Sequence, residues 1–409
     1  MNNQKCILVC VDNSSYDVKT SMEELSELAF TAGANVKEKF IQKLDTINSS
    51  TYVGSGKLLE IKEYCEKNNI DLVIFDDELT GTQIRNIENY IDNIKVIDRT
   101  MLILDIFAQR AFSKEGKLQV ELAQQKYILP RLSGEGTALS RQGGGIGTRG
   151  PGETKLESNR RHIRNRIYSL NKEIQELSKR RDMIRQRRNK NGVVTIAIVG
   201  YTNAGKSTLL NLLTDSNILA KNQLFATLDP TARELKLPDG QNVIFIDTVG
   251  FIRRLPHMLI DSFKSTLEEV SNADLILNIC DISSDQADSQ IEVTKELLKE
   301  LKCQNIPVIT VYNKCDLCNI PVRYSKDFKS VFISAKNNQG IDYLLKCICE
   351  NLSKLVKKVE LEIPYHRISI MNLIRKNGTI IYEKYENDYI KIKAVIDKKM
   401  IKTVTDFIV

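Results

Sequence analysis

The segment Gly200-Tyr-Thr-Asn-Ala-Gly-Lys-Ser207 has residue types and a spacing that could hold phosphate groups. It matches the pattern G-x-x-x-x-G-K-[ST], in which glycines let backbone N–H groups close around phosphates. The apolar stretch Val194–Val199 precedes it and a helix-compatible stretch follows, so the loop would open a helix whose dipole attracts anions. We predict that Lys206 contacts the β- and γ-phosphates and that Ser207 binds Mg²⁺.

A second element, Asp247-Thr-Val-Gly250, directly follows the apolar stretch Val243–Ile246. A carboxylate at a strand end can hold the water shell of Mg²⁺, and a glycine lets its own amide approach a γ-phosphate. We therefore predict a water-mediated contact from Asp247 to the metal ion. Gly250 is predicted as a catalytic position together with Lys206.

Between these two elements lies Phe225-Ala-Thr-Leu-Asp229, followed by Pro230 and Thr231. A loop hydroxyl that joins the Mg²⁺ shell only when the γ-phosphate is present is how such switches sense nucleotide state. We predict that Thr227 is this residue, a metal ligand and a third catalytic position. Thr231 is the alternative, and an ordinary turn is the simpler interpretation.

Two further elements predict which base is bound. Asn313-Lys-Cys-Asp316 follows the strand-like Pro307–Tyr312, and Ser334-Ala-Lys336 follows Val331–Ile333. A carboxylate facing the N1 and N2 hydrogens of guanine discriminates against adenine, which would leave it unpaired. The motifs therefore predict GTP and GDP as ligands. The complete set of predicted nucleotide contacts is Gly200, Tyr201, Thr202, Asn203, Ala204, Gly205, Lys206, Ser207, Thr208, Phe225, Ala226, Thr227, Leu228, Asp229, Asp247, Thr248, Val249, Gly250, Asn313, Lys314, Asp316, Ser334, Ala335 and Lys336.

Two positions bear on the mechanism of hydrolysis. Phe251 follows Gly250, where Ras-like proteins orient the attacking water with glutamine, and a phenyl ring cannot hydrogen-bond water. We expect slow hydrolysis by the isolated protein and completion of the site by a partner. Asn203 lies inside the phosphate loop and resembles the asparagine of GTPases that bind K⁺ beside the phosphates. The alternative is that its amide only braces the turn.

Basic charge is concentrated in one stretch of the chain. The whole protein carries +7, whereas residues 153–190 alone hold thirteen Lys or Arg against five Asp or Glu, a local +8. Apolar residues in this stretch recur at alternating spacings of three and four, which predicts a long helix with a coiled-coil seam. The asymmetry indicates contact with a polyanion, and the solvated face of a coiled coil is the alternative.

The remaining composition favours a protein of the reducing cytosol. Hydrophobic residues make up 42% and charged residues 27%, as in ordinary globular proteins. We find neither an apolar run long enough to span a membrane nor a signal peptide. The nine cysteines are scattered without a disulfide framework, and Cys315-x-x-Cys318 lacks a second pair at zinc-site spacing. We therefore expect a cytoplasmic protein.

The elements that must position these motifs predict an α/β fold. Strand-like Cys6–Val11 and Leu72–Phe75 alternate with helical stretches, and Gly116–Leu129 forms a helix that Pro130 should stop. Leu255–Val270 should form a helix of the second switch. We predict a P-loop GTPase doubly wound sheet, preceded by a small parallel α/β domain with an antiparallel helical hairpin and followed by a small α+β domain. The predicted boundaries are 1–112 for the N-terminal α/β subdomain, 113–191 for the hairpin with its glycine-rich tip loop, 192–356 for the G domain and 357–409 for the C-terminal domain.

Three motifs together carry a family resemblance. The loop Gly143-Gly-Gly-Ile-Gly-Thr-Arg-Gly-Pro-Gly-Glu-Thr-Lys-Leu-Glu157 resembles the signature of the HflX family of ribosome-binding GTPases. Tyr52-Val-Gly-Ser-Gly-Lys57 and Phe225-Ala-Thr-Leu-Asp229 do so as well. The resemblance implies Mg²⁺ dependence, binding to the large ribosomal subunit, and a role in splitting or rescuing stalled ribosomes under stress. It therefore implies a cytoplasmic protein that is partly ribosome-associated, and we expect a monomer.

A flexible, arginine-containing loop on a basic helical stalk suits ribosomal RNA, because glycines allow close approach and arginines pair with phosphates. The predicted RNA contacts are Arg141, Gly143, Gly144, Gly145, Thr148, Arg149, Arg160, Arg161 and Arg164. Alternatives are an RNA-binding or ribosome-assembly factor with incidental turnover, a tRNA-modifying GTPase, and an ATP-driven RNA remodeller. A second phosphate loop is not evident, since Gly54-Ser-Gly-Lys57 lacks the spacing of the first.

Overall fold

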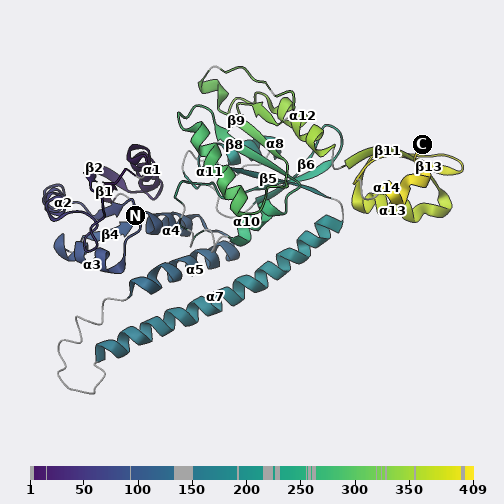
Figure 1. Cartoon of the computed structure of the whole chain (residues 1–409). Coiled ribbons are helices and arrows are strands. Elements are labelled where there is room, and N and C mark those ends of the chain that lie inside the picture. Colours follow the sequence, from purple (N-terminus) through teal and green to yellow (C-terminus); the bar gives the residue numbers. More distant parts are fainter. Residues whose placement is uncertain are drawn as a thin grey trace. The chain divides into compact units, whose positions relative to one another are not determined.

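The structure is a computed structural model. It describes residues 4–14, 16–92, 94–132, 151–190, 193–214, 224–225, 231–254, 256, 259, 264–318, 320–323, 325–327, 329–353, 356–397 and 401–409. The chain divides into two units, Met1–Glu176 with Leu255–Phe263, and Leu177–Arg254 with Lys264–Val409 (Figure 1).

The first unit begins with a parallel α/β layer. Its elements are β1 (Lys5–Asp12), α1 (Val18–Thr31), β2 (Asn35–Lys43), α2 (Ser55–Asn68), β3 (Leu72–Phe75), α3 (Gly81–Tyr90), β4 (Lys95–Asp98), α4 (Arg99–Arg110) and α5 (Lys114–Arg131). The strands pair in the order β2-β1-β3-β4, all parallel. The central strands are buried along nearly their whole length, which is why they are continuous apolar runs. The predicted strands Cys6–Val11 and Leu72–Phe75 are thus confirmed.

Strands β2 and β4 were not predicted from the sequence. Edge strand β2 is mostly exposed and carries several charged side chains, so it lacks a clear apolar pattern. Strand β4 has four residues, as β3 does, but its sequence Lys-Val-Ile-Asp contains only two apolar residues, so no apolar run marks it. Helix α3, also unpredicted, begins with a capping box in which Thr80 and Gln83 satisfy each other's backbone N–H groups.

Helix α5 and the long helix α7 (Pro151–Lys190) form the predicted helical hairpin (Figure 1). Arg166 of α7 binds Glu121 of α5 through two nitrogens, at 2.6 and 2.7 Å, and Leu170 of the predicted seam is fully buried. The expectation that Pro130 stops α5 is wrong by one residue, because Pro130 lies inside the last turn and α5 ends at Arg131. The glycine-rich tip loop lies outside the described residues.

The second unit contains a mixed six-stranded sheet. Its elements are β5 (Val194–Gly200), α8 (Lys206–Thr214), β6 (Thr231–Lys236), β7 (Asn242–Asp247), α10 (Lys264–Ser271), β8 (Leu275–Asp281), α11 (Ala287–Glu300), β9 (Val308–Asn313), the 3₁₀ turn η2 (Cys315–Leu317), β10 (Ser330–Phe332) and α12 (Ile341–Leu352). The strand order is β10-β9-β8-β5-β7-β6. The predicted doubly wound sheet is confirmed, with the addition that β6 is an antiparallel edge strand.

Helices cover both faces of this sheet. Apolar side chains of α8 and α12 share one core cluster with Leu277 and Ile279 of β8. The next residue along β8, Cys280, points to the opposite face and packs against Ile291 of α11. The predicted helix Leu255–Val270 is present only as α10 in the described residues, and most of its predicted first half lies outside them.

A three-stranded antiparallel sheet completes the chain. Its elements are β11 (Val356–Pro364), η3 (Tyr365–Arg367), α13 (Ile368–Asn377), β12 (Gly378–Tyr385), β13 (Tyr389–Asp397), α14 (Ile401–Val404) and η5 (Thr405–Phe407). The order is β11-β13-β12, and α13 packs on one face, where its Ile374 shares a core cluster with Leu361 of β11 and Ile392 of β13. The predicted α+β class is confirmed. Asn377 and Gly378 mark the junction of α13 and β12 and do not form a hairpin turn.

Candidate functional site

The predicted phosphate loop connects β5 to α8, as the motif requires. Gly200 has a φ of +141°, and a Cβ there would lie 2.1 Å from the carbonyl oxygen of Ile279. Gly205 has a φ of +96°, and a Cβ there would lie 2.2 Å from Nδ2 of Asn313. Both positions therefore require glycine for steric as well as conformational reasons. The result is a loop whose backbone closes tightly at the N-terminus of α8.

Lys206 is buried at the start of α8. Its Nζ donates hydrogen bonds to the carbonyl oxygens of Gly200 and Tyr201, at 3.0 and 2.8 Å. Burial lowers the pKa of Lys206 to about 8, and the nearby Asp247 partly opposes this. An ammonium group held by two neutral carbonyls inside the protein is poorly compensated. It would gain strongly from an anionic phosphate in the same loop.

The residues predicted to hold Mg²⁺ are adjacent. Ser207 Oγ donates to Oδ2 of Asp247 at 3.0 Å, and Asp247 is fully buried at the end of β7. A hydroxyl beside a carboxylate is a donor set that fits Mg²⁺, which prefers oxygen ligands and keeps several waters. Bound there, the ion would supply charge neutralisation for the β- and γ-phosphates. Thr231, the alternative hydroxyl, lies opposite Asp247 in the β6–β7 ladder.

The segment after β7 is joined to the phosphate loop by backbone hydrogen bonds. Phe251 N donates to Gly200 O at 3.0 Å, and Thr202 N donates to Phe251 O at 2.8 Å. Gly250, which directly precedes Phe251, has no space for a side chain, since a Cβ would lie 2.9 Å from Lys206 Nζ. The Phe251 ring is buried, so this position offers no group that orients water. Tyr201 adds a further link, because its hydroxyl accepts from Arg253 N at 2.8 Å.

The predicted guanine motif is fixed to the phosphate loop. Asn313, at the end of β9, donates through Nδ2 to Ala204 O at 2.9 Å and accepts at Oδ1 from Ala335 N at 3.0 Å. One side chain thus connects the phosphate loop, the guanine motif and the Ser334–Lys336 loop. Ser334 is fully buried, and its Oγ accepts from Asn337 N at 3.2 Å.

Asp316 carries the feature that best indicates a guanine ligand. Its Oδ1 atom is buried and has no hydrogen-bond partner among the described residues. A buried unpaired carboxylate oxygen is costly, so its presence points to an external donor. Lys314 beside it has a φ of +64° and an ion pair with Asp281 at 2.6 Å. Sequence reasoning missed Asp281, whose only signal was its place at the end of β8.

Asn203 has a φ of +62° in the phosphate loop. Asparagine tolerates this left-handed conformation better than most residues do. This φ value describes the backbone of Asn203 and does not decide between the two interpretations of its side-chain amide made from the sequence. The side-chain amide can bind K⁺ or brace the turn without a change in this backbone conformation.

Several predicted residues cannot be placed. Of the nucleotide contacts, Ala226, Thr227, Leu228 and Asp229 lie outside the described residues, and Phe225 beside them is buried with a φ of +52°. The hairpin-tip residues Arg141, Gly143, Gly144, Gly145, Thr148 and Arg149 also lie outside them. Arg161 and Arg164 are exposed on α7, and Arg160 is partly exposed.

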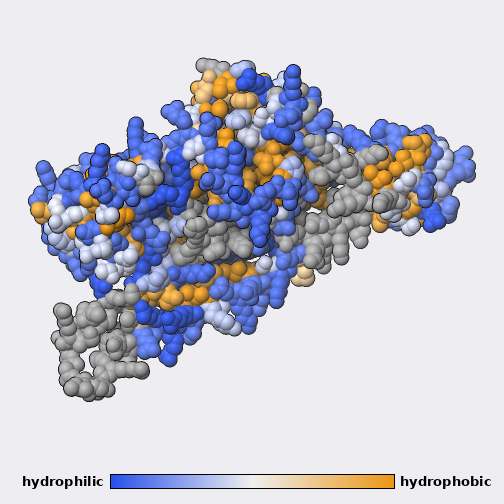
Figure 2. Space-filling view, viewed as in Figure 1, coloured by the Kyte–Doolittle hydropathy of each residue, from blue (hydrophilic) through white to orange (hydrophobic). Residues whose placement is uncertain are grey.

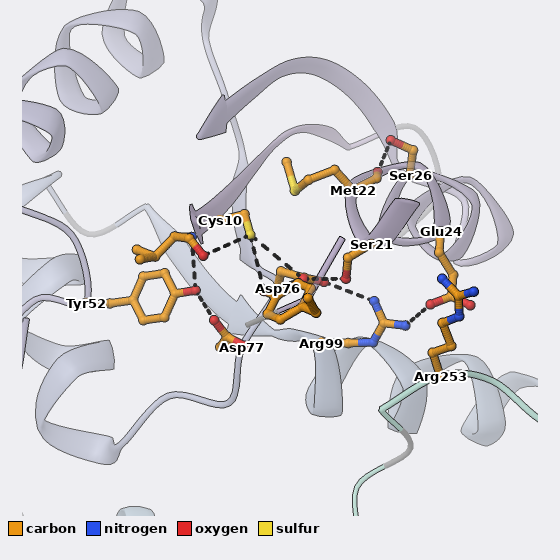
Figure 3. Close-up of polar contacts among 12 residues, drawn as sticks. Cys10, Ser21, Met22, Glu24, Ser26, Tyr52, Asp76, Asp77, Arg99 and Arg253 are labelled. Carbon is orange, nitrogen blue, oxygen red and sulfur yellow. Dashed lines mark hydrogen bonds and ion pairs between the residues drawn. The ribbon is translucent and has the colours of Figure 1, made fainter. Parts of the chain in front are cut away.

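A second polar cluster lies at the carboxyl edge of the N-terminal sheet (Figure 3). Asp76 accepts from Ser21 Oγ at 2.6 Å and from Arg99 Nη1 at 2.9 Å, and Arg99 also pairs with Glu24. The ring of Tyr52 fills the space beside β1. Its hydroxyl donates to Asp77 and accepts from Val11 N.

Open parallel sheets commonly bind ligands at this edge, where the strand order reverses. Here the chain's own Tyr52 occupies that position and is 1% exposed. The motif Tyr52–Lys57 therefore has a packing role in this unit. Among the described residues, no three His, Cys, Asp or Glu side chains are placed to hold a metal ion. Cys315 is buried, and the Sγ of Cys318 donates to Ile282 O. Among the helices of the described residues, none combines the length and the apolar composition that a membrane span requires.

Comparison with known proteins covers nearly the whole chain. Residues 19–108 match the family model described as GTP-binding GTPase N-terminal, and residues 110–188 match GTP-binding GTPase Middle Region. Residues 195–314 match the model described as 50S ribosome-binding GTPase.

Similar proteins carry one recurring description. The GTPase HflX of Caldanaerobacter subterraneus subsp. tengcongensis is 51% identical over 408 residues, which cover 100% of this chain and 94% of that protein. The GTPase HflX of Escherichia coli (strain K12) is 42% identical over 348 residues, covering 84% and 82%. Among solved structures, a GTP-binding protein from Sulfolobus solfataricus in complex with GDP has a TM-score of 0.45 at 25% identity, covering 86% of this chain and 99% of that one.

Proposed function

Since the chain belongs to the HflX family of GTPases, we propose that it hydrolyses GTP on the large ribosomal subunit and uses the cycle to split or rescue stalled ribosomes under stress. The observation that carries this proposal is the match of residues 195–314 to the 50S ribosome-binding GTPase model. The nucleotide site supports it, because Lys206, Ser207, Asp247 and Asp316 are arranged for a guanine nucleotide with Mg²⁺. A ribosome-bound protein of this kind would be cytoplasmic, and we propose that it acts as a monomer.

The residues of the site divide the work of hydrolysis. Backbone amides of the Gly200–Ser207 loop and the Lys206 ammonium hold the β- and γ-phosphates, and Asp316 reads the base. The Gly250 amide can approach the γ-phosphate because no Cβ intervenes. The buried Phe251 contributes no hydrogen bond to the attacking water. The isolated protein should therefore turn over slowly and the ribosome should accelerate it.

GTP turnover with and without purified large ribosomal subunits tests this proposal. We expect strong stimulation by the subunits, because they would supply the missing orientation of water. A Lys206→Ala variant serves as the inactive control. Equal rates with and without subunits would refute ribosome-activated hydrolysis and would favour the alternative, an RNA-binding or ribosome-assembly factor in which turnover is incidental.

We also propose that the hairpin binds ribosomal RNA, with Arg141 and Arg149 at its tip and Arg160, Arg161 and Arg164 on α7. The exposure of Arg161 and Arg164 and the local charge of +8 over residues 153–190 support this. Neutralising Arg161 and Arg164 should weaken subunit binding and lower its salt dependence, because fewer phosphates would be neutralised. Unchanged binding at every salt concentration would contradict the proposal.

The K⁺ proposal concerns Asn203. We propose that its side-chain oxygen binds K⁺ beside the phosphates, where the cation would offset the charge that develops during hydrolysis. The variant Asn203→Gly keeps the left-handed backbone and removes only the amide. If K⁺ binds there, the wild-type rate should be higher in KCl than in NaCl and the difference should vanish in the variant. Equal wild-type rates in KCl and NaCl would refute the K⁺ site at Asn203.

A further inference from the structure

One exposed cysteine lies beside the predicted guanine motif. All nine cysteines belong to the described residues, and seven of them are buried, Cys349 is partly buried and Cys318 is exposed. Hydrophilic residues make up most of the surface visible in Figure 2, as expected when thiols and apolar side chains pack inside. Burial raises the pKa of the Cys349 thiol to about 11, and a thiol that stays protonated is a poor nucleophile. Cys318 is therefore the cysteine that an oxidant in solution reaches first.

A second cysteine, Cys315, lies in the same turn as Cys318. The turn η2 begins at Cys315, and Cys318 is the residue that caps its end. The backbone N of Cys318 donates to Cys315 O at 3.3 Å, which closes the turn. In a 3₁₀ turn the side chains at positions i and i+3 lie one above the other, and a rise of about 2.0 Å per residue places their Cα atoms about 6 Å apart. Disulfides span about 4.4–6.8 Å between Cα atoms, so the backbone holds these two cysteines within bonding range.

A bond between the two sulfurs would disturb the carboxylate that lies between them in the chain. Both cysteines are free thiols, Cys315 is buried, and the Sγ of Cys318 donates to Ile282 O at 3.8 Å. An S–S bond of about 2.0 Å requires at least one of these sulfurs to leave its place and to pull on the turn. The turn carries Asp316, whose Oδ1 is buried and has no hydrogen-bond partner among the described residues. Hydrogen bonds weaken steeply with distance and angle, so a shift of this turn would weaken the grip of Asp316 on a guanine base.

We propose that Cys315 and Cys318 form a reversible disulfide that weakens guanine nucleotide binding when the protein meets a peroxide. The thiolate of Cys318 attacks one peroxide oxygen, the O–O bond breaks, and the second oxygen leaves as water after taking up the thiol proton. The sulfur of Cys315 then attacks the resulting sulfenic acid at Cys318, the S–O bond breaks, and a second water leaves with the proton of Cys315. The two sulfurs together lose two electrons, which reduce the peroxide to water.

This disulfide would make the guanine site responsive to oxidants, and the inference rests on the proposed function through that site. In cytosolic proteins of ordinary organisms the disulfides that do form are usually transient, and many of them sense redox conditions. A pair with one exposed and one buried thiol fits such a sensor, because the exposed sulfur meets the oxidant and the buried one resolves the sulfenic acid.

The first test treats the nucleotide-free full chain with equimolar hydrogen peroxide and titrates it with a fluorescent GDP analogue. Oxidised wild type should bind at least about tenfold more weakly than reduced wild type, because hydrogen bonds to a charged group are weakened, and dithiothreitol should restore the affinity. The variant Cys318→Ser keeps a donor for Ile282 O, so it should bind like the reduced wild type before and after peroxide. The matched control Cys349→Ser removes the other cysteine that is not fully buried, and it should keep the response to peroxide.

The second test uses only the wild type and follows from reciprocal coupling of the two equilibria. If the disulfide weakens GDP binding, GDP must disfavour the disulfide by the same factor. Saturating GDP should therefore raise the midpoint potential of the pair by at least about 30 mV, since tenfold equals 29.6 mV for two electrons. Peptide mapping by mass spectrometry identifies the Cys315–Cys318 link.

Three results would overturn the inference. They are the absence of this link after peroxide treatment, equal GDP affinity of the linked and reduced proteins, and an equal loss of affinity in oxidised Cys318→Ser. A reduced wild type that fails to bind GDP would instead refute the guanine site and the proposed function itself.

Discussion

Replacing Asp316 by asparagine is the most direct test of base recognition. Guanine presents two N–H donors at N1 and N2, and the carboxylate of Asp316 can accept from both. Its Oδ1 atom is buried and lacks a hydrogen-bond partner among the described residues, so it is available for this purpose. An asparagine amide keeps one acceptor and places a donor where the second acceptor was. We expect Asp316→Asn to weaken GTP binding and to favour xanthosine triphosphate, which carries a carbonyl in place of the N2 amino group.

The magnitude follows from the two hydrogen bonds. Each bond to a charged group contributes about 1.5–3 kcal/mol, so losing the charge and one acceptor while opposing two donors should cost at least about 3 kcal/mol. That corresponds to a loss of about two orders of magnitude in affinity. The fold should be retained, because the substitution preserves shape and Asp316 makes no hydrogen bond that supports the loop through Oδ1.

Fluorescent GDP and xanthosine diphosphate analogues measure both affinities by titration, with unlabelled nucleotides as competitors. Asp342→Asn is the matched control, because it removes an exposed carboxylate from the first turn of α12 and lies outside the predicted site. A variant that still prefers GTP, or that loses less than threefold in affinity for it, would refute the assignment of Asp316 to the base.

Three other predictions concern the fold around the site. Gly205→Ala should lower nucleotide affinity by at least about tenfold and should lower the melting temperature, because its Cβ would lie 2.2 Å from an amide nitrogen. Gly56→Ala, with nothing within 4 Å of the added Cβ, should lower neither. Lys206→Met should make the nucleotide-free protein more stable by up to about 3 kcal/mol below pH 8, since burial lowers the lysine pKa from 10.5 to about 8. Between pH 8 and 10.5 the Lys206 side chain is protonated in the unfolded chain and neutral in the folded one, so the stability of the wild type rises with pH. The stability difference between Lys206→Met and the wild type should therefore disappear near pH 10.5. A difference in melting temperature that is constant with pH would contradict this. Arg99→Met should destabilise the N-terminal domain by about 3–5 kcal/mol in chemical denaturation, because it removes the buried cation that compensates the charges of Asp76 and Glu24, and Arg375→Met at an exposed pair should cost far less. Similar losses for the two arginine variants would show that burial does not set the cost.

The sequence was sufficient for the parts of the site that obey local rules. Gly200, Gly205 and Lys206 lie where the motif places them, because a tight loop between a buried strand and a helix leaves few alternatives. The apolar runs of β1 and β3 were visible for the same reason, since a strand buried on both faces has a continuous apolar sequence.

The parts that were missed depend on contacts between residues far apart in the chain. Edge strand β6 owes its place to pairing with β7, and its sequence has no periodic pattern of burial. The role of Tyr52 appears only when the loop before α2 folds back onto Asp77 and Val11, which are 25 and 41 residues away. The pairing of Lys314 with Asp281 likewise spans 33 residues. Local propensity carries no information about such partners.

The two hydrogen bonds of the Asn313 side chain have a consequence for how the protein exchanges its nucleotide. Because the same amide group touches Ala204 on one side and Ala335 on the other, the loops that hold the base and the phosphates cannot separate without breaking one of its bonds. Displacing the Ser334–Lys336 loop from outside would therefore either break the bond from Ala335 N to Asn313 Oδ1 or pull on the phosphate loop through Ala204. A factor that pulled on this loop while Asn313 kept both bonds would act on the phosphate end from the base side.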